Sequence, residues 1–144
     1  MSDFRYLTQT FAVSPQLTVN DIEDASRRGF ALIVNNRPEG ESDDQLAGAA
    51  AEAAATACGL DYLAIPISPG GFNEQQIDAL VAALDRSGGP VLAYCRSGTR
   101  SALLWALTQT RLGRDPDRIG EDLARAGYDI APIRPLLDRL ATSR

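Results

Sequence analysis

Three short apolar segments, each preceded by a helix signal, constrain the fold of this chain most strongly. They lie at residues 31–36, 62–67 and 91–95, and their residues are almost continuously apolar rather than alternating with polar ones. Strands of this kind are typical of a parallel sheet that helices cover on both faces. The sequence therefore predicts an α/β fold of three layers, in which a mainly parallel sheet is flanked by helices.

Capping residues followed three positions later by Asp or Gln predict the beginnings of three helices. These pairs are Thr18 with Asp21, Ser42 with Gln45, and Asn73 with Gln76. The alanine-rich residues 47–57 continue the second helix, which Gly59 ends. A further helix is expected over about residues 101–112, and Pro116 and Pro132 indicate two more near the C-terminus.

Length and charge exclude several classes of protein. A chain of 144 residues fits one domain over residues 1–144. No apolar run approaches the ~20 residues of a membrane span, so we expect no membrane partner. The first residues lack the pattern of a signal peptide, which predicts a cytoplasmic protein with reduced thiols. The 14 basic residues are outnumbered by 19 acidic ones, which argues against a nucleic-acid partner.

Histidine is absent, which excludes serine–histidine triads, histidine bases and most zinc sites. The two cysteines, Cys58 and Cys95, have no metal-ligand spacing and are far apart, so we expect no metal, no cofactor and no disulfide. Cys58 follows an alanine-rich helix and is interpreted as a small buried side chain. Cys95 ends an apolar strand and needs a separate explanation.

Ligands of open parallel sheets bind beyond the carboxyl ends of the strands, and Cys95 lies at such an end. Residues 95–101 read Cys-Arg-Ser-Gly-Thr-Arg-Ser and lead into a helix. Successive backbone N–H groups in such a loop can surround an anion, and the helix N-terminus adds a favourable dipole. This setting favours a thiolate. The sequence therefore predicts that Cys95 is a nucleophile in an anion-binding loop.

The other loop residues are predicted to bind the substrate or to position it. Arg100, together with Cys95, is assigned to catalysis, and Arg96 also holds the negative charge of the substrate. The substrate-binding residues are predicted to be Arg96, Ser97, Gly98, Thr99, Ser101 and Arg37. Arg37 follows a strand and either faces the same pocket or pairs with Glu39 or Glu41. Phe72 is placed at the pocket mouth, and Trp105 in the core.

The loop of residues 95–101 resembles the active-site loop of single-domain rhodaneses. The whole chain resembles a bacterial family of tyrosine-phosphatase-like fold, the beta-lactamase hydrolase-like N-terminal domain family. The segments that carry this second resemblance are residues 35–41, 65–67, 89–91 and 95–101. The resemblance implies a dual-specificity or tyrosine phosphatase-like fold and either sulfurtransferase or phosphatase activity. Some members are fused to a metallo-β-lactamase-like persulfide dioxygenase, which implies such an enzyme as a partner.

Two activities are compatible with this loop, and both act on a small anion of sulfur or phosphate. Phosphatases of this type place five residues between cysteine and arginine, usually have histidine before the cysteine, and use an aspartate as general acid. Here four residues separate Cys95 from Arg100, Tyr94 replaces the histidine, and residues 68–72 contain no aspartate. Glu74 is a substitute for that acid or an ordinary residue of a helical first turn.

Sulfur transfer needs no such proton donor, and the sequence therefore favours a rhodanese-like sulfurtransferase. Its Cys95 thiolate would form a persulfide from thiosulfate or a low-molecular-weight persulfide. The alternative is a cysteine-dependent protein-tyrosine or dual-specificity-like phosphatase with a phosphocysteine intermediate. A third hypothesis is a non-catalytic sensor that binds an anion or a persulfide.

Overall fold

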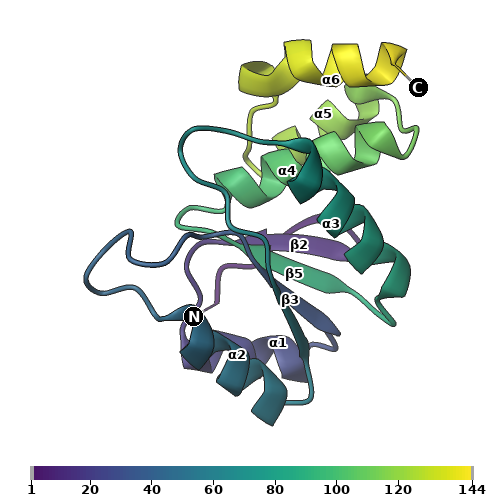
Figure 1. The fold of residues 1–144 in the computed structure, drawn as a ribbon. Coiled ribbons are helices and arrows are strands. Elements are labelled where there is room, and N and C mark those ends of the chain that lie inside the picture. The colour runs from purple at the N-terminus through teal and green to yellow at the C-terminus, as the bar shows by residue number, and fades with distance from the viewer. Residues whose placement is uncertain (1, 144) are drawn as a thin grey trace.

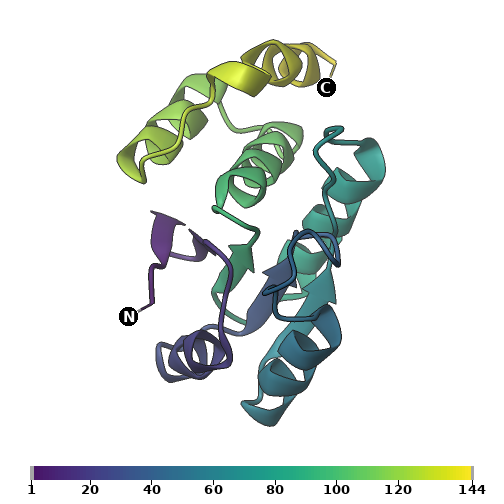
Figure 2. The same cartoon turned by 90° about the vertical axis from the view of Figure 1, so that its left-hand side faces the viewer.

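The computed structural model describes residues 2–143 and shows a five-stranded sheet between layers of helices (Figures 1 and 2). The strands are β1 (Arg5–Thr8), β2 (Phe11–Ser14), β3 (Leu32–Asn35), β4 (Asp61–Ala64) and β5 (Val91–Tyr94). Their order across the sheet is β1-β2-β5-β3-β4. The β1–β2 pair is antiparallel, and the other three pairs are parallel. The predicted α/β fold with a mainly parallel sheet is confirmed.

Helices cover both faces of the sheet. They are α1 (Val19–Arg27), α2 (Gly48–Ala57), α3 (Glu74–Arg86), α4 (Thr99–Arg111), α5 (Pro116–Arg125) and α6 (Arg134–Thr142), the last preceded by a 3₁₀ turn at Ala131–Ile133. Helices α1 and α2 lie on one face of the sheet, and α3 and α4 lie on the other (Figure 1). Helices α5 and α6 pack on the outer side of α4.

Successive residues of the central strands point into two separate cores, because side chains alternate along a strand. Ile33 and Leu92 pack with α1 and α2, whereas Val34 and Ala93 pack with α3 and α4. All four side chains are buried. Burial on both faces explains why these strands are continuously apolar in the sequence.

Most of the predicted helix ends agree with the structure. Thr18 and Asn73 form capping boxes at α1 and α3. Asp115 caps α5, with Pro116 in its first turn. The start predicted at Ser42 is wrong, because α2 begins at Gly48. The hydroxyl of Ser42 accepts a hydrogen bond from Arg37 and donates one to Asp44, so it does not cap a helix.

The hairpin of β1 and β2 was not predicted from the sequence. Both strands have four residues, and β1 lies at an edge of the sheet, where its residues are mostly half-buried or exposed. Such a short edge strand has no strong apolar pattern.

In the part of the chain that the structure describes, no helix has the length and apolar character that crossing a membrane requires.

The strand register brings three loops to the same edge of the sheet. Tyr94, the last residue of β5, lies opposite Ser14 of β2 and Asn35 of β3. The chain therefore leaves three neighbouring strands at one level, and the loops after β2, β3 and β5 meet there. Cys95 begins the central one of these loops.

Candidate active site

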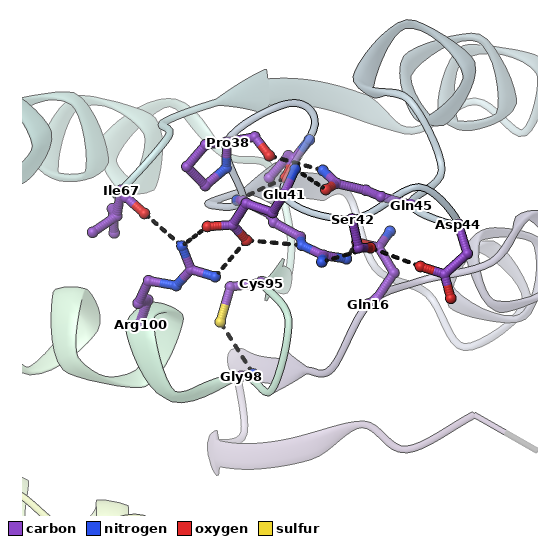
Figure 3. Close-up of polar contacts among 12 residues, drawn as sticks. Gln16, Pro38, Glu41, Ser42, Asp44, Gln45, Ile67, Cys95, Gly98 and Arg100 are labelled. Atoms are coloured by element: carbon purple, nitrogen blue, oxygen red, sulfur yellow. Dashed lines mark hydrogen bonds and ion pairs between the residues drawn. The ribbon is translucent and has the colours of Figure 1, made fainter. Parts of the chain in front are cut away.

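The Cys95 side chain lies at the base of the loop between β5 and α4. Cys95 is fully buried, and its Sγ accepts a hydrogen bond of 3.1 Å from the backbone N–H of Gly98 (Figure 3). Gly98 is the N-cap of α4, so this N–H belongs to the helix end that attracts negative charge. The N-terminus of α4 therefore lies beside the sulfur atom.

Gly98 is required here for two reasons. Its φ of +91° lies in the left-handed region, which residues with a Cβ rarely adopt. A Cβ at this position would also overlap the hydroxyl group of Tyr128. Glycine at this position therefore permits the close approach of the Tyr128 hydroxyl.

Arg100 is held by Glu41. Its Nη1 donates to Oε2 of Glu41 at 2.7 Å and to the carbonyl oxygen of Ile67 at 2.7 Å, and its Nη2 donates to Oε1 of Glu41 at 2.8 Å. Three of the five N–H groups of a guanidinium are used in these bonds. The other two, on Nε and Nη2, share one edge of the guanidinium plane. Figure 3 shows this side chain beside Cys95.

Glu41 also binds Arg37, which lies on its other side. Arg37 is almost fully buried, and its Nε donates to Oε1 of Glu41 at 2.9 Å. Its Nη1 donates to Gln16 and its Nη2 to Ser42. Hydrogen bonds from Arg100, and then from Arg37, lower the pKa of the Glu41 carboxyl to about 2 despite its desolvation. Glu41 is therefore an ionised carboxylate between two guanidinium groups.

The pairing of Arg37 with Glu41 is one of the two alternatives that the sequence left open for Arg37. Each of the three nitrogens of its guanidinium already donates to a protein oxygen. We therefore infer that Arg37 supports Glu41. Direct contact of Arg37 with a substrate stays a prediction.

The hydroxyl of Ser101 donates to Oδ1 of Asn36 at 2.7 Å, and both residues are buried. Asn36 in turn donates to the carbonyl oxygen of Ile65. Ser101 was predicted from the sequence to be a substrate-binding residue. The observed hydrogen bond ties the first turn of α4 to the loop after β3, so its proton is directed to Asn36 and not to sulfur.

The remaining loop residues face outward. Arg96, Ser97 and Thr99 are exposed, and the hydroxyl of Ser97 donates to that of Thr99 at 3.0 Å. An open depression at this edge of the sheet is lined by Pro38, Glu41, Ser68, Pro69, Arg96 and Arg100. Arg96 and Arg100 thus line one surface together with the Glu41 carboxylate, and anion binding by the two arginines stays a prediction.

Two further predictions concern residues near the site. Trp105 is buried in the core, as predicted, and its ring lies near that of Phe11. Phe72 packs against the core on the α3 and α4 side, and it is not among the residues that line the depression. Glu74 lies in the first turn of α3. Within residues 2–143, no group of three or more metal-ligating side chains is present.

Three residues of this site, Gln16, Asn36 and Tyr128, were not predicted from the sequence, and neither was the pairing of Glu41 with Arg100. Asn36 and Glu41 lie in residues 35–41, one of the segments that carried the family resemblance, so that segment contained a usable signal. Tyr128 is 31 residues from its partner Ser97 and lies in no recognisable motif. Only the folded chain reveals its contact.

Comparison with known proteins identifies related sequences. Residues 3–112 match the protein family described as "Beta-lactamase hydrolase-like protein, phosphatase-like domain". A beta-lactamase hydrolase-like protein of Xylella fastidiosa (strain 9a5c) is 34% identical over 136 residues, which are 94% of this chain and 32% of that protein. This chain therefore spans about a third of the length of the curated relatives that it matches.

Solved structures show the same fold. The crystal structure of a candidate phosphatase from Neisseria meningitidis has a TM-score of 0.80 and 28% identity, and the match covers 97% of each chain. A kinase associated phosphatase, crystallised with its catalytic site cysteine replaced by serine, has a TM-score of 0.71 and 16% identity, covering 98% of this chain and 96% of that one. The expected similarity to phosphatase folds is confirmed.

Proposed function

Because the chain belongs to the family of the phosphatase-like domain of beta-lactamase hydrolase-like proteins, we propose that it is a cysteine-dependent phosphatase acting on phosphate monoesters. The observation that carries this proposal is the hydrogen bond from Gly98 N–H to Cys95 Sγ, at a helix N-terminus beside Arg100. Sulfur transfer was the activity favoured from the sequence, and the comparisons with known proteins give the phosphatase alternative more support.

The proposed reaction has two steps on Cys95. In the first, the thiolate attacks phosphorus, an S–P bond forms, and the P–O bond to the leaving group breaks with its electron pair on oxygen. In the second, water attacks the phosphocysteine, the S–P bond breaks, and phosphate and a proton leave while the thiolate is restored. Backbone N–H groups of the loop and the Nε–Nη2 edge of Arg100 stabilise the charge on the phosphoryl oxygens.

The need to protonate the leaving group limits which phosphate esters this enzyme would hydrolyse. The carboxylate that lines the depression is Glu41, whose pKa of about 2 and two arginine partners keep it ionised. It therefore has no proton to give to a departing oxygen, and loss of general acid catalysis costs about 10²–10⁴ in rate. We expect aryl phosphates, whose phenolate leaves without a proton, to be hydrolysed much faster than alkyl phosphates.

The same ionised Glu41 supports rhodanese-like sulfur transfer as a second candidate function. In that reaction, Cys95 Sγ attacks the outer sulfur of thiosulfate, a new S–S bond forms, and the S–S bond of thiosulfate breaks to release sulfite. A thiol or cyanide acceptor then takes the sulfur and restores the thiolate. No step needs a protein acid, and a persulfide dioxygenase would be a suitable partner for a persulfide product.

One preparation of the protein distinguishes these two functions. Release of nitrophenolate from an aryl phosphate is compared with formation of thiocyanate from thiosulfate and cyanide. Cys95→Ser should abolish whichever of the two activities the protein has. Cys58→Ser should retain that activity, because it alters the half-buried cysteine at the end of α2. Phosphate release that depends on Cys95 supports the proposal. Thiocyanate formation that depends on Cys95, without phosphate release, would overturn it in favour of sulfur transfer.

A further inference from the structure

The segment after α5 returns to the active-site loop. Tyr128 follows α5, beyond the residues 3–112 that match the family, and only 8% of its surface is exposed. Its hydroxyl donates a hydrogen bond of 3.3 Å to the carbonyl oxygen of Ser97. The same hydroxyl lies against Gly98, where a Cβ would overlap it. Tyr128 therefore packs directly behind the loop that carries Cys95.

The peptide group between Ser97 and Gly98 connects Tyr128 to the sulfur atom. Its carbonyl oxygen accepts from Tyr128, and its N–H donates to Cys95 Sγ at 3.1 Å. A peptide group is planar, so a bond that holds its oxygen also fixes the direction of its N–H. Hydrogen bonds in series also polarise one another. The Tyr128 hydroxyl thus strengthens and aims the N–H that faces the sulfur atom.

Arg5 sets the orientation of this hydroxyl. Its Nη1 donates to Tyr128 Oη at 3.3 Å, and its guanidinium lies over the Tyr128 ring at 5.4 Å. Because Oη accepts from Arg5, its own proton is directed to Ser97. Arg5 is itself paired with Asp3 at 2.9 Å. Burial raises the pKa of Tyr128, which keeps the hydroxyl protonated as a donor.

We propose that Tyr128 is a positioning residue that holds the Ser97–Gly98 peptide in the orientation needed by the Cys95 nucleophile. The inference rests on the proposed function, in that it takes Cys95 to be the reacting group. It assigns to the segment after α5 a role in the chemistry of a loop that lies about 30 residues earlier in the chain.

The test removes the hydroxyl alone, in Tyr128→Phe. Tyr6→Phe is the matched control, because Tyr6 is 45% exposed and stacks on Phe30 at the edge of the sheet. Three properties are measured for each variant: kcat and KM with an aryl phosphate, the rate of alkylation of Cys95 by iodoacetamide from pH 5 to 9, and thermal unfolding. Alkylation is measured in the Cys58→Ser background, so that Cys95 is the one remaining cysteine that can react.

We expect Tyr128→Phe to lower kcat about 2–10-fold, the range expected for one hydrogen bond, with KM nearly unchanged. Its alkylation profile should move to higher pH, because a weaker N–H donor stabilises the thiolate less. A purely structural role would lower thermal stability and leave the alkylation profile in place. Values of kcat and an alkylation profile equal to those of Tyr6→Phe would overturn the inference.

Alkylation does not require phosphatase activity, so the two proposals can fail separately. If neither variant nor the wild-type protein hydrolyses an aryl phosphate, the proposed function fails. A shifted alkylation profile in Tyr128→Phe would still support the positioning role in that case. If hydrolysis is present and the profile does not move, the positioning role fails and the proposed function stands.

Discussion

Two supports hold the Cys95 loop, one at Arg100 and one at Gly98, and they differ in chemistry. At Arg100 the support is ionic, with a Glu41 carboxylate between two buried or half-buried guanidinium groups. At Gly98 the support is a single neutral hydroxyl, that of Tyr128. The ionic contacts fix the long side chain of Arg100, whereas the Tyr128 hydroxyl orients the peptide group between Ser97 and Gly98. The two supports should therefore respond differently to mutation and to pH.

The largest effect is expected at Gly98, the residue whose N–H donates to the sulfur atom. Gly98→Ala places a Cβ in the left-handed region, which costs about 1–2 kcal/mol, and adds overlap with Tyr128. We expect a loss of roughly 5–10 °C in Tm and a fall in kcat of about 100-fold, because the N–H is displaced from the sulfur atom. Thermal unfolding and steady-state kinetics measure the two effects.

A double mutant separates the two causes in Gly98→Ala. In the Tyr128→Phe background, the closest atom to the added Cβ is gone, so Gly98→Ala should cost less stability than in the wild-type protein. Neighbouring residues are expected to be non-additive in this way. Strictly additive changes in Tm would show that the Tyr128 hydroxyl does not press on Gly98.

Removal of the charge at Glu41 tests the ionic support. Glu41→Gln keeps the shape of the side chain but leaves Arg37 and Arg100 without their anionic partner. Arg100 then loses its orientation, and we expect kcat to fall about 10–100-fold. Glu52→Gln, on the exposed side of α2, is the matched control and should have full activity. An active Glu41→Gln variant would show that Arg100 is held by other contacts.

The smallest of these effects is the response of the ionic support to acid. The folded protein lowers the pKa of Glu41 from 4.5 to about 2. Its ion pairs therefore stabilise the folded state above about pH 4.5, and this contribution is lost as the pH falls toward 2. We expect the wild-type protein to exceed Glu41→Gln by about 3–6 °C in Tm at pH 6, with the difference shrinking as the pH falls toward 2. A difference in Tm that does not change with pH would show that contacts other than these ion pairs provide the stability.

The regular part of the fold could be predicted because its signals are local. The strand ending at Asn35, the capping boxes at Thr18 and Asn73, and the proline after Asp115 each depend on residues within a few positions. The site was predicted less completely. Its central loop is contiguous in the sequence, but Glu41 and Arg100 are 59 residues apart, and their pairing depends on the order of strands in the sheet.

The error at Ser42 has the same origin. The residue types at Ser42 and Gln45 fit a capping box, but Arg37 and Glu41 compete for these side chains. Buried ionic groups need partners more than a helix needs a cap, so the segment forms a loop around Arg37 and α2 starts later. Local propensity is overruled at the functional site because the site needs those side chains.

The central claim is that Cys95 forms a covalent phosphoryl intermediate. Acid quenching of the protein during turnover of an aryl phosphate, followed by mass spectrometry of its peptides, tests this claim directly. We predict that one phosphoryl group is found on the peptide containing Cys95 and is absent in Cys95→Ser. Hydrolysis without a labelled Cys95 peptide, or a gain of sulfur from thiosulfate in place of the phosphoryl group, would contradict it.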